Sequence, residues 1–186
     1  MRLSVITSNP GKVEEYRSAF SGMNIEMEHR RCTYAEPQVD SLEEVVRSGL
    51  QELRSKGLQD FIIDDSGLFV ESLQGFPGVY SAYVQKTLGN HGLLKQMDGV
   101  QDRRANFQCC IGCSLEGYLD TVVSGRCDGT LLTEACGVGG FGYDPIFSVD
   151  GIRSFAEMGV KEKNVISHRG LAINALAGRL QELLRD

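Results

Sequence analysis

The chain has 186 residues and a formal net charge of −6, a length that suits one domain with enough apolar content for its own core. The negative charge argues against a general nucleic-acid-binding protein, which would carry a basic face. No stretch has the length and apolarity of a transmembrane span, and Met1–Gly11 lacks the apolar core of a signal peptide. We therefore expect a cytoplasmic protein that binds neither nucleic acid nor membrane.

The first third of the chain predicts alternating strands and helices. Ser41 and Glu44 have the spacing of a capping box, in which each side chain satisfies a free backbone N–H. An apolar stripe from Leu42 to Leu53 then predicts an amphipathic helix. The elements expected before it are a strand over Arg2–Thr7, a break at Ser8–Gly11, a helix over Lys12–Phe20 and a strand over Ile25–Glu28.

Two adjacent carboxylates, Asp64 and Asp65, follow an apolar run that predicts a buried strand over Phe61–Asp64. Neighbouring carboxylates repel each other, so a sheet edge rarely carries them without a cation. Magnesium, and through it a phosphorylated substrate, is the natural inference. The alternative is an acidic turn, since Asp, Ser and Gly are turn formers.

The rest of the chain completes a mixed, partly antiparallel sheet flanked by helices, of the α/β or α+β class. Glu116–Gly117 predicts a hairpin between two of its strands. The expected elements are strands over Leu68–Leu73, Asn106–Ser114, Tyr118–Ser124 and Arg126–Leu132, a turn at Gly75–Gly78, and helices over Gly92–Met97 and His168–Leu184.

The six cysteines do not predict a zinc site. Cys110 and Cys113 have CxxC spacing, but they lie on an expected strand, where residues three apart point to opposite faces. We expect reduced, mostly buried thiols.

Two common phosphate-binding motifs match only in part. A P-loop ending at Lys12 would need a glycine in place of Ile6 and a Ser or Thr in place of Val13. The GxGxxG spacing that ends at Gly142 precedes a turn and a strand instead of opening a helix. What remains is the strand–loop–helix at Ser8–Lys12, whose free N–H groups, amide and ammonium suit phosphate oxygens.

Together with the acid pair, this loop resembles the inosine/xanthosine triphosphate pyrophosphatase family. Five blocks match in the family's order, and they span nearly the whole chain. They are Thr7–Lys12, Asp64–Leu68, Gly75–Ala82, Gly140–Phe147 and Ile166–Gly170.

The resemblance implies one domain over residues 1–186, an elongated α/β fold of two lobes with a central cleft, and a homodimer. It also implies Mg²⁺-dependent hydrolysis of non-standard purine nucleoside triphosphates (ITP, dITP, XTP) to the monophosphate and pyrophosphate, which cleanses the nucleotide pool. The alternatives are a related pyrophosphatase for modified pyrimidine or methylated nucleotides, and a non-catalytic nucleotide sensor.

The resemblance also assigns a role to each matching residue. Asp65 is implied as the general base, and the implied magnesium ligands are Glu36, Asp64 and Asp65. The residues implied to bind phosphate are Thr7, Ser8, Asn9, Lys12, Ser66 and Lys86. Those implied to bind the nucleoside are Phe141, Gly142, Tyr143, Asp144, Lys163, His168 and Arg169.

Three of the residues implied to bind the nucleoside also have a plain structural interpretation. Lys163 lies in a charge run that is typical of a solvated surface, Phe141 is able to fix a loop in the core, and Ser167 with His168 reads as a helix start. The implied reaction needs no covalent nucleophile. Ser66 is disfavoured as one, because no histidine is near it in the sequence to activate it.

Overall fold

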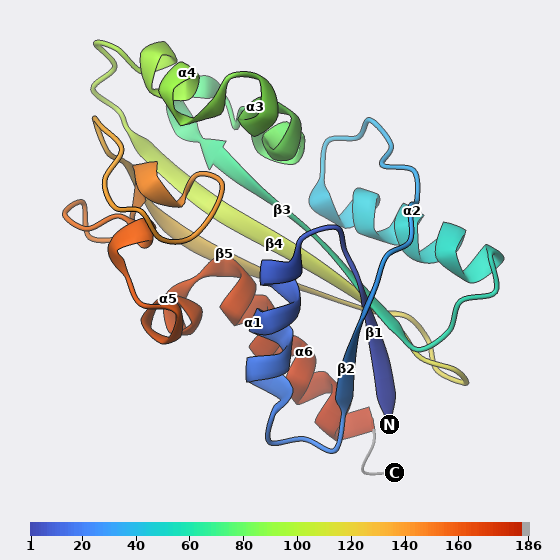
Figure 1. Cartoon of the computed structure of the whole chain (residues 1–186). Helices are drawn as coiled ribbons and strands as arrows, with labels where there is room; N and C mark the ends of the chain where they lie inside the picture. Colours follow the sequence, from blue (N-terminus) through green and yellow to red (C-terminus); the bar gives the residue numbers. More distant parts are fainter. Residues whose placement is uncertain (184–186) are drawn as a thin grey trace. The chain divides into compact units, whose positions relative to one another are not determined.

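A computed structural model describes residues 1–183 of the chain. Its strands form one six-stranded sheet in the order β2-β1-β3-β4-β5-β6 (Figure 1). The strand β1 pairs in parallel with β2 and β3, whereas β5 pairs with β6 in antiparallel. The strands are β1 (Arg2–Ile6), β2 (Glu26–Arg30), β3 (Phe61–Val70), β4 (Arg104–Ser114), β5 (Thr121–Leu131) and β6 (Phe147–Ser148).

Six α-helices accompany this sheet within the described residues. They are α1 (Pro10–Phe20), α2 (Leu42–Ser55), α3 (Ser81–Thr87), α4 (Gly89–Gln96), α5 (Val160–Ile166) and α6 (His168–Leu183). A mixed sheet flanked by helices confirms the predicted fold class. The helices α3 and α5 were not predicted, and Leu184, the expected last residue of α6, lies outside the described residues.

The chain divides into two compact units. The first contains residues 1–65, 109–125 and 169–186, and the second contains residues 66–108 and 126–168. The boundaries fall within β3, β4 and β5, so each of these strands contributes to both units. The expected arrangement as one domain with two lobes stays a prediction.

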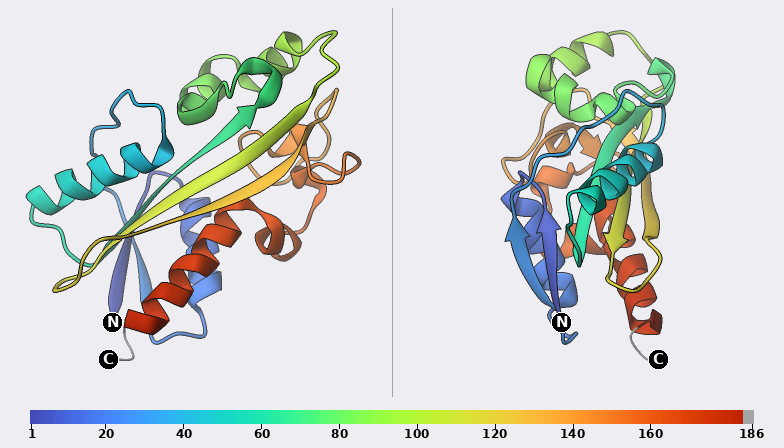
Figure 2. Two further views of the ribbon diagram at one scale, coloured as in Figure 1. Left: turned by 180° about the vertical axis from the view of Figure 1, so that it is seen from behind. Right: turned by 90° about the vertical axis from the view of Figure 1, so that its right-hand side faces the viewer.

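In the first unit, helices cover both faces of the sheet (Figure 2). Residues of α1 and α6, such as Tyr16 and Leu176, share a core cluster with Cys109, Ile111 and Cys113 of β4. On the other face α2 packs so closely that a Cβ added at Gly112 would meet Val46 and Leu50. The alternation of odd and even positions along β4 therefore decides which helix each residue contacts.

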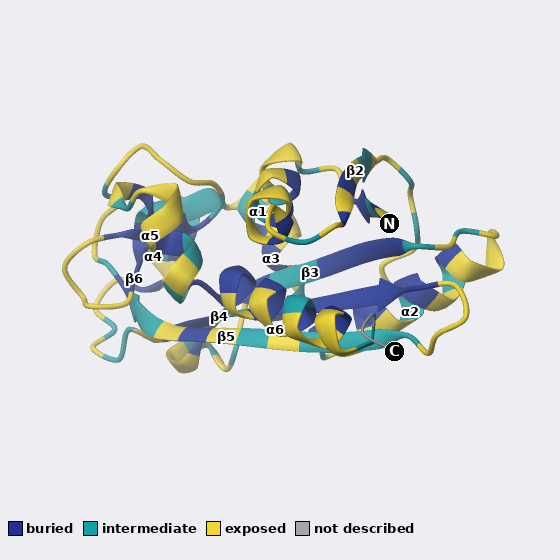
Figure 3. Ribbon diagram, turned by 90° about the horizontal axis from the view of Figure 1, so that it is seen from below, coloured by how far each residue is buried: buried dark blue, intermediate teal, exposed yellow. Residues whose placement is uncertain are grey.

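The second unit has its own aromatic core. The ring of Phe107 on β4 lies 4.6 Å from that of Phe147 and 6.1 Å from that of Phe155. Leu68 and Val70 from the second half of β3 belong to the same cluster. Figure 3 shows that β4 is buried, whereas β5 carries exposed and partly exposed residues along much of its length.

The acid pair lies inside a strand, and the prediction that the strand ends there was wrong. The strand β3 runs without interruption through Asp64, Asp65 and Gly67. Similarly, β5 is one strand where two were expected, because it passes through Gly125. The turn-forming residues of β3 stay extended because long-range contacts hold them.

One such contact is the close approach of Gly67 to the carbonyl oxygen of Gly78, where a Cβ on Gly67 would overlap that oxygen. The Ser81 hydroxyl bridges the same segments, since it accepts a hydrogen bond from the Leu68 N–H at 2.8 Å and donates one to the Gly78 carbonyl at 2.6 Å. Only glycine at position 67 permits this arrangement.

Gly67→Ala is therefore expected to lower the free energy of unfolding by about 1–3 kcal/mol, as measured by urea denaturation. Gly22→Ala is the matched control, because a Cβ at Gly22 meets nothing within 4 Å. Equal stability of the two variants would contradict the close approach.

No helix among residues 1–183 is both long and apolar enough to cross a membrane. The six cysteines are free thiols, and four of them, Cys109, Cys110, Cys113 and Cys127, are buried. This confirms the prediction of reduced, mostly buried cysteines.

Candidate active site

Asp64 and Asp65 point to opposite faces of β3, because successive side chains alternate along a strand. Asp64 is buried on the face that carries α1 and α6, and only 6% of its surface is exposed. Asp65 is partly exposed. The two carboxylates therefore meet different surroundings despite being neighbours in the sequence.

Asp64 is held between two cations. Its Oδ2 atom lies 3.0 Å from Lys12 Nζ and 3.1 Å from Arg169 Nε. Burial by itself would raise the pKa of Asp64, but the charges of Lys12 and Arg169 outweigh it, so this pKa lies below its ordinary value. Asp64 is thus an ionised carboxylate whose charge is already compensated, although its Oδ1 atom is buried with no hydrogen-bond partner within the described structure.

Arg169 also forms an ion pair with Glu15, a residue that no sequence motif indicated. Its Nη1 atom lies 3.1 Å from Glu15 Oε2, and only 2% of Arg169 is exposed. Glu15 and Lys12 both project from α1, so acid and base alternate in the order Glu15, Arg169, Asp64, Lys12. The nucleoside-binding role that the resemblance implies for Arg169 stays a prediction.

The three acids predicted to bind magnesium act electrostatically on the partly buried phenol of Tyr34. Burial, followed by the charges of Asp64, Glu36 and Asp65, raises the pKa of the Tyr34 hydroxyl. The three acids predicted to bind magnesium therefore all lie near Tyr34, a residue that carried no signal in the sequence.

Within residues 1–183, no three His, Cys, Asp or Glu side chains are grouped closely enough to hold one metal ion. Magnesium commonly uses one or two carboxylates and completes its shell with waters and substrate phosphates. The partly exposed Asp65 and the exposed Glu36 are carboxylates that fit such an ion, and the predicted role of Asp64 as a third ligand stays a prediction.

The predicted phosphate loop lies at the start of α1. Asn9 caps this helix, since its Oδ1 atom accepts a hydrogen bond from the Gly11 N–H at 2.9 Å. Thr7 fixes the loop from the other side, because its hydroxyl accepts from the Asn9 N–H at 3.1 Å and its carbonyl lies 2.9 Å from His29 Nε2. Ser8 is exposed, and the Nζ atom of Lys12 lies 3.2 Å from the Asp64 carbonyl. Hydrogen bonds within the protein therefore fix the positions of Thr7, Asn9 and Lys12.

The other two residues expected to bind phosphate belong to the second unit. Ser66 directly follows the acid pair within β3 and is partly exposed, and Lys86 is exposed on α3. Their role in binding phosphate stays a prediction.

The predicted nucleoside loop, Gly140–Asp144, is built around the carboxylate of Asp144. Its Oδ2 atom accepts a hydrogen bond from the Phe141 N–H at 2.8 Å and forms an ion pair with Lys163 Nζ at 2.6 Å. Lys163 Nζ also lies 4.9 Å from the centre of the Phe141 ring. With 7% of its surface exposed, Lys163 is not a solvated charge, and Phe141, at 39%, is not buried in the core.

Two further residues complete this group in the second unit. The Tyr143 hydroxyl donates to the Ser81 carbonyl at 2.9 Å, which ties the loop to α3. The His168 ring stacks on Phe107 at 4.5 Å between ring centres. The structure thus brings Phe141, Asp144 and Lys163 into contact, as expected of one binding surface.

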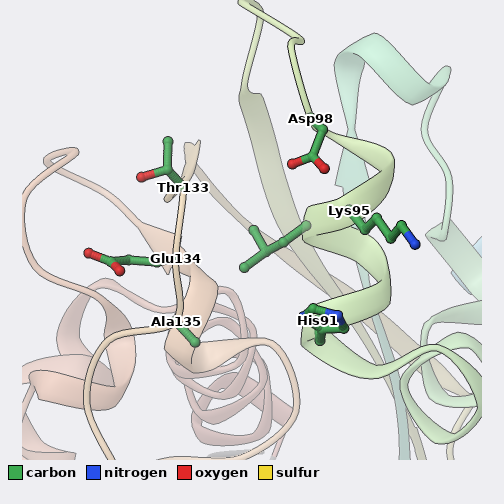
Figure 4. A pocket seen from close by; sticks show the side chains of 7 residues that line it. His91, Lys95, Asp98, Thr133, Glu134 and Ala135 are labelled. Carbon is green, nitrogen blue, oxygen red and sulfur yellow. The ribbon is translucent and has the colours of Figure 1, made fainter.

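A separate hollow of about 560 Å³ in the second unit lies between α4 and the segment after β5 (Figure 4). The carboxylate of Asp98 points toward the segment that carries Thr133, whereas the Lys95 side chain extends away from it. None of the predicted site residues lines this hollow.

Comparison with known proteins places the chain in a family. The profile of the Ham1 family matches residues 3–179. The chain belongs to the Ham1 family. This confirms the resemblance that the five sequence blocks indicated.

Known proteins are similar to this chain over nearly their whole length. The dITP/XTP pyrophosphatase of Thermococcus kodakarensis is 50% identical over 186 residues, which cover 100% of both chains. That of Pyrococcus horikoshii is 47% identical over 94% of each chain. The solved structure of the Staphylococcus aureus Ham1 protein has a TM-score of 0.84 and 29% identity, and the match covers 98% of this chain and 99% of that one.

Proposed function

We propose that this protein is a magnesium-dependent pyrophosphohydrolase that converts dITP, ITP and XTP to the nucleoside monophosphate and pyrophosphate. The observation that carries the proposal is the arrangement around β3, where Asp65 is partly exposed while Asp64 orders Lys12 of the phosphate loop. The naming of relatives as dITP/XTP pyrophosphatases supports the choice of substrate. Removal of such nucleotides would cleanse the nucleotide pool.

Asp65 acts as the general base in this proposal. It takes a proton from a water molecule whose oxygen attacks the α-phosphorus, the bridging bond between the α- and β-phosphates breaks, and pyrophosphate leaves. Glu36 and Asp65 would hold the Mg²⁺ ion, which neutralises phosphate charge and positions the triphosphate when bound. No covalent nucleophile is required.

The phosphate loop supplies the groups that receive the triphosphate. Ser8 and the N–H groups at the start of α1 contact phosphate oxygens, and Lys12 stabilises the departing pyrophosphate. Asp64 keeps the Lys12 ammonium in place, and Arg169 in turn orients Asp64. Ser66 and Lys86 contribute further phosphate contacts.

Base selection follows from hydrogen-bond polarity. Hypoxanthine and xanthine present a carbonyl at position six, where adenine presents an amino group. Donors from the nucleoside loop and from Lys163 and His168 satisfy that carbonyl and would meet adenine donor to donor. Such a site discriminates by about 10⁴-fold, because the wrong base leaves buried polar groups unpaired.

The test is turnover of dITP, XTP, dGTP, ATP and dTTP with Mg²⁺ or with EDTA, with pyrophosphate separated from orthophosphate. We expect strong preference for dITP and XTP, release of monophosphate and pyrophosphate, and loss of activity in EDTA. Orthophosphate as the first product would contradict attack at the α-phosphorus. Preference for dTTP would favour the pyrimidine-directed alternative, and tight binding of dITP without turnover would favour a sensor.

Two expectations complete the proposal, the first from the resemblance and the second from the sequence. A homodimer and a cytoplasmic location are consistent with it, and both stay predictions.

A further inference from the structure

The carbonyl oxygen of Gly142 is held by two side-chain amides from different helices. Gln85 Nε2 on α3 donates to it at 3.1 Å, and Asn90 Nδ2 on α4 donates at 3.0 Å. A carbonyl oxygen has two lone pairs, so these two donors use its full capacity to accept hydrogen bonds. All three residues belong to the second unit.

This double contact determines the orientation of one peptide group in the nucleoside loop. In a trans peptide, the C=O and the N–H point in opposite directions. Because the Gly142 carbonyl faces Gln85 and Asn90, the N–H of Tyr143 in the same peptide is aimed away from these two amides. Gly142 has φ +62°, in the left-handed region that suits glycine. The side chain of Tyr143 is fixed separately, because its hydroxyl donates to the Ser81 carbonyl.

The two amides donate to Gly142 while their own oxygen atoms accept no hydrogen bond within the described structure. Gln85 Oε1 and Asn90 Oδ1 are buried and have no hydrogen-bond partner within the described structure. A buried acceptor that loses its water hydrogen bonds destabilises the protein. A carbonyl only accepts hydrogen bonds, so both amides must turn their nitrogen atoms toward Gly142. In this orientation both amide oxygens stay unsatisfied.

We propose that Gln85 and Asn90 are positioning residues that set base specificity. By holding the Gly142 carbonyl, they aim the Tyr143 N–H as a fixed donor toward the acceptor edge of a 6-oxopurine. An amino group at the same position, as in adenine, would meet this N–H donor to donor. The inference rests on the proposed function, because it names the groups that orient the nucleoside loop.

The experiment compares Asn90→Asp and Asn90→Ala with wild type, by kcat and KM for dITP and dATP and by thermal unfolding. Asn90→Asp keeps the shape and the acceptor oxygen but removes the donor to Gly142. We expect both variants to lower the ratio of kcat/KM for dITP over dATP by about tenfold, mainly through KM for dITP. Gln96→Ala, an exposed change on the same helix, is the matched control and should leave this ratio unchanged.

A second pair of variants tests the shared acceptor. Gln85→Glu should lower the same ratio, and the double variant Gln85→Glu/Asn90→Asp should lose less than the product of the single effects, because both act on one carbonyl.

Three results would overturn the inference. If the ratio of kcat/KM for dITP over dATP stayed at the wild-type value in Asn90→Asp but fell in Asn90→Ala, the amide oxygen would be the functional atom. A lowered thermal midpoint with an unchanged ratio would mean a structural role only. Absence of dITP turnover in the wild type would instead remove the proposed function, and this inference with it.

Discussion

Asp65→Asn is expected still to bind dITP and to hydrolyse it about 10³-fold more slowly. The amide keeps the size of the carboxylate but does not take a proton from water, and a general base contributes about 10²–10⁴-fold to the rate. Single-turnover rates at saturating nucleotide, together with calorimetric binding in Mg²⁺, measure the two effects separately.

Asp98→Asn is the control, since this exposed acid lines the separate hollow beside α4 and should retain full activity. Full activity in Asp65→Asn would remove Asp65 as the base. If binding fell and the rate per bound nucleotide did not, Asp65 would serve only to hold the metal.

Arg169→Met should lower the free energy of unfolding by about 3–5 kcal/mol, as measured by urea denaturation. The substitution removes the cation that lies 3.1 Å from Glu15 and one of the two cations that pair with Asp64, which keeps Lys12 at 3.0 Å. The side chains of Arg169 and Asp64 are 3% and 0% exposed. A buried charge that loses its partner without being removed is destabilising by this amount.

Arg179→Met, on the same helix α6, provides the comparison. Arg179 pairs with Glu182 at 3.2 Å, but the two side chains are 66% and 68% exposed. Exposed pairs contribute at most about 1 kcal/mol, so this variant should stay close to wild type. An equal decrease in the free energy of unfolding in the two variants would show that burial of the Arg169 ion pairs does not account for their contribution to stability.

Elements specified by local signals were predicted well. The strand β1, the loop at Ser8 and Asn9, and α1 occur in the expected order, because an Asn cap and a Pro at the first helical position define the helix start. The helix α2 begins after Ser41 as expected. There the hydroxyl accepts the Glu44 N–H at 3.2 Å and donates to the Glu44 carboxylate at 2.7 Å.

Elements that depend on distant partners were not predicted. The sequence Asp64–Gly67 has the composition of a turn, yet it stays extended within β3. The ion pair between Arg169 and Asp64 joins residues 105 positions apart, and the contact of Lys12 with the Asp64 carbonyl spans 52 positions. Neither separation leaves a periodic pattern in the sequence.

The same limit applies to the site. The family blocks indicated Asp144 and Lys163 individually, but only the fold shows that they form a buried pair. Glu15, Tyr34, Gln85 and Asn90 belong to no block of the resemblance, because they act on neighbouring groups through tertiary contacts. Their roles became visible only from distances and burial.

The buried thiols provide a built-in reporter of local opening. Burial raises the pKa of Cys110 to about 11, of Cys113 to about 12 and of Cys127 to about 11, so very little reactive thiolate forms at neutral pH. Cys110 and Cys113 lie in the first unit, and Cys127 lies in the second. Alkylation followed by mass spectrometry would therefore time the exposure of each core and reveal whether the two unfold as one cooperative body or in succession.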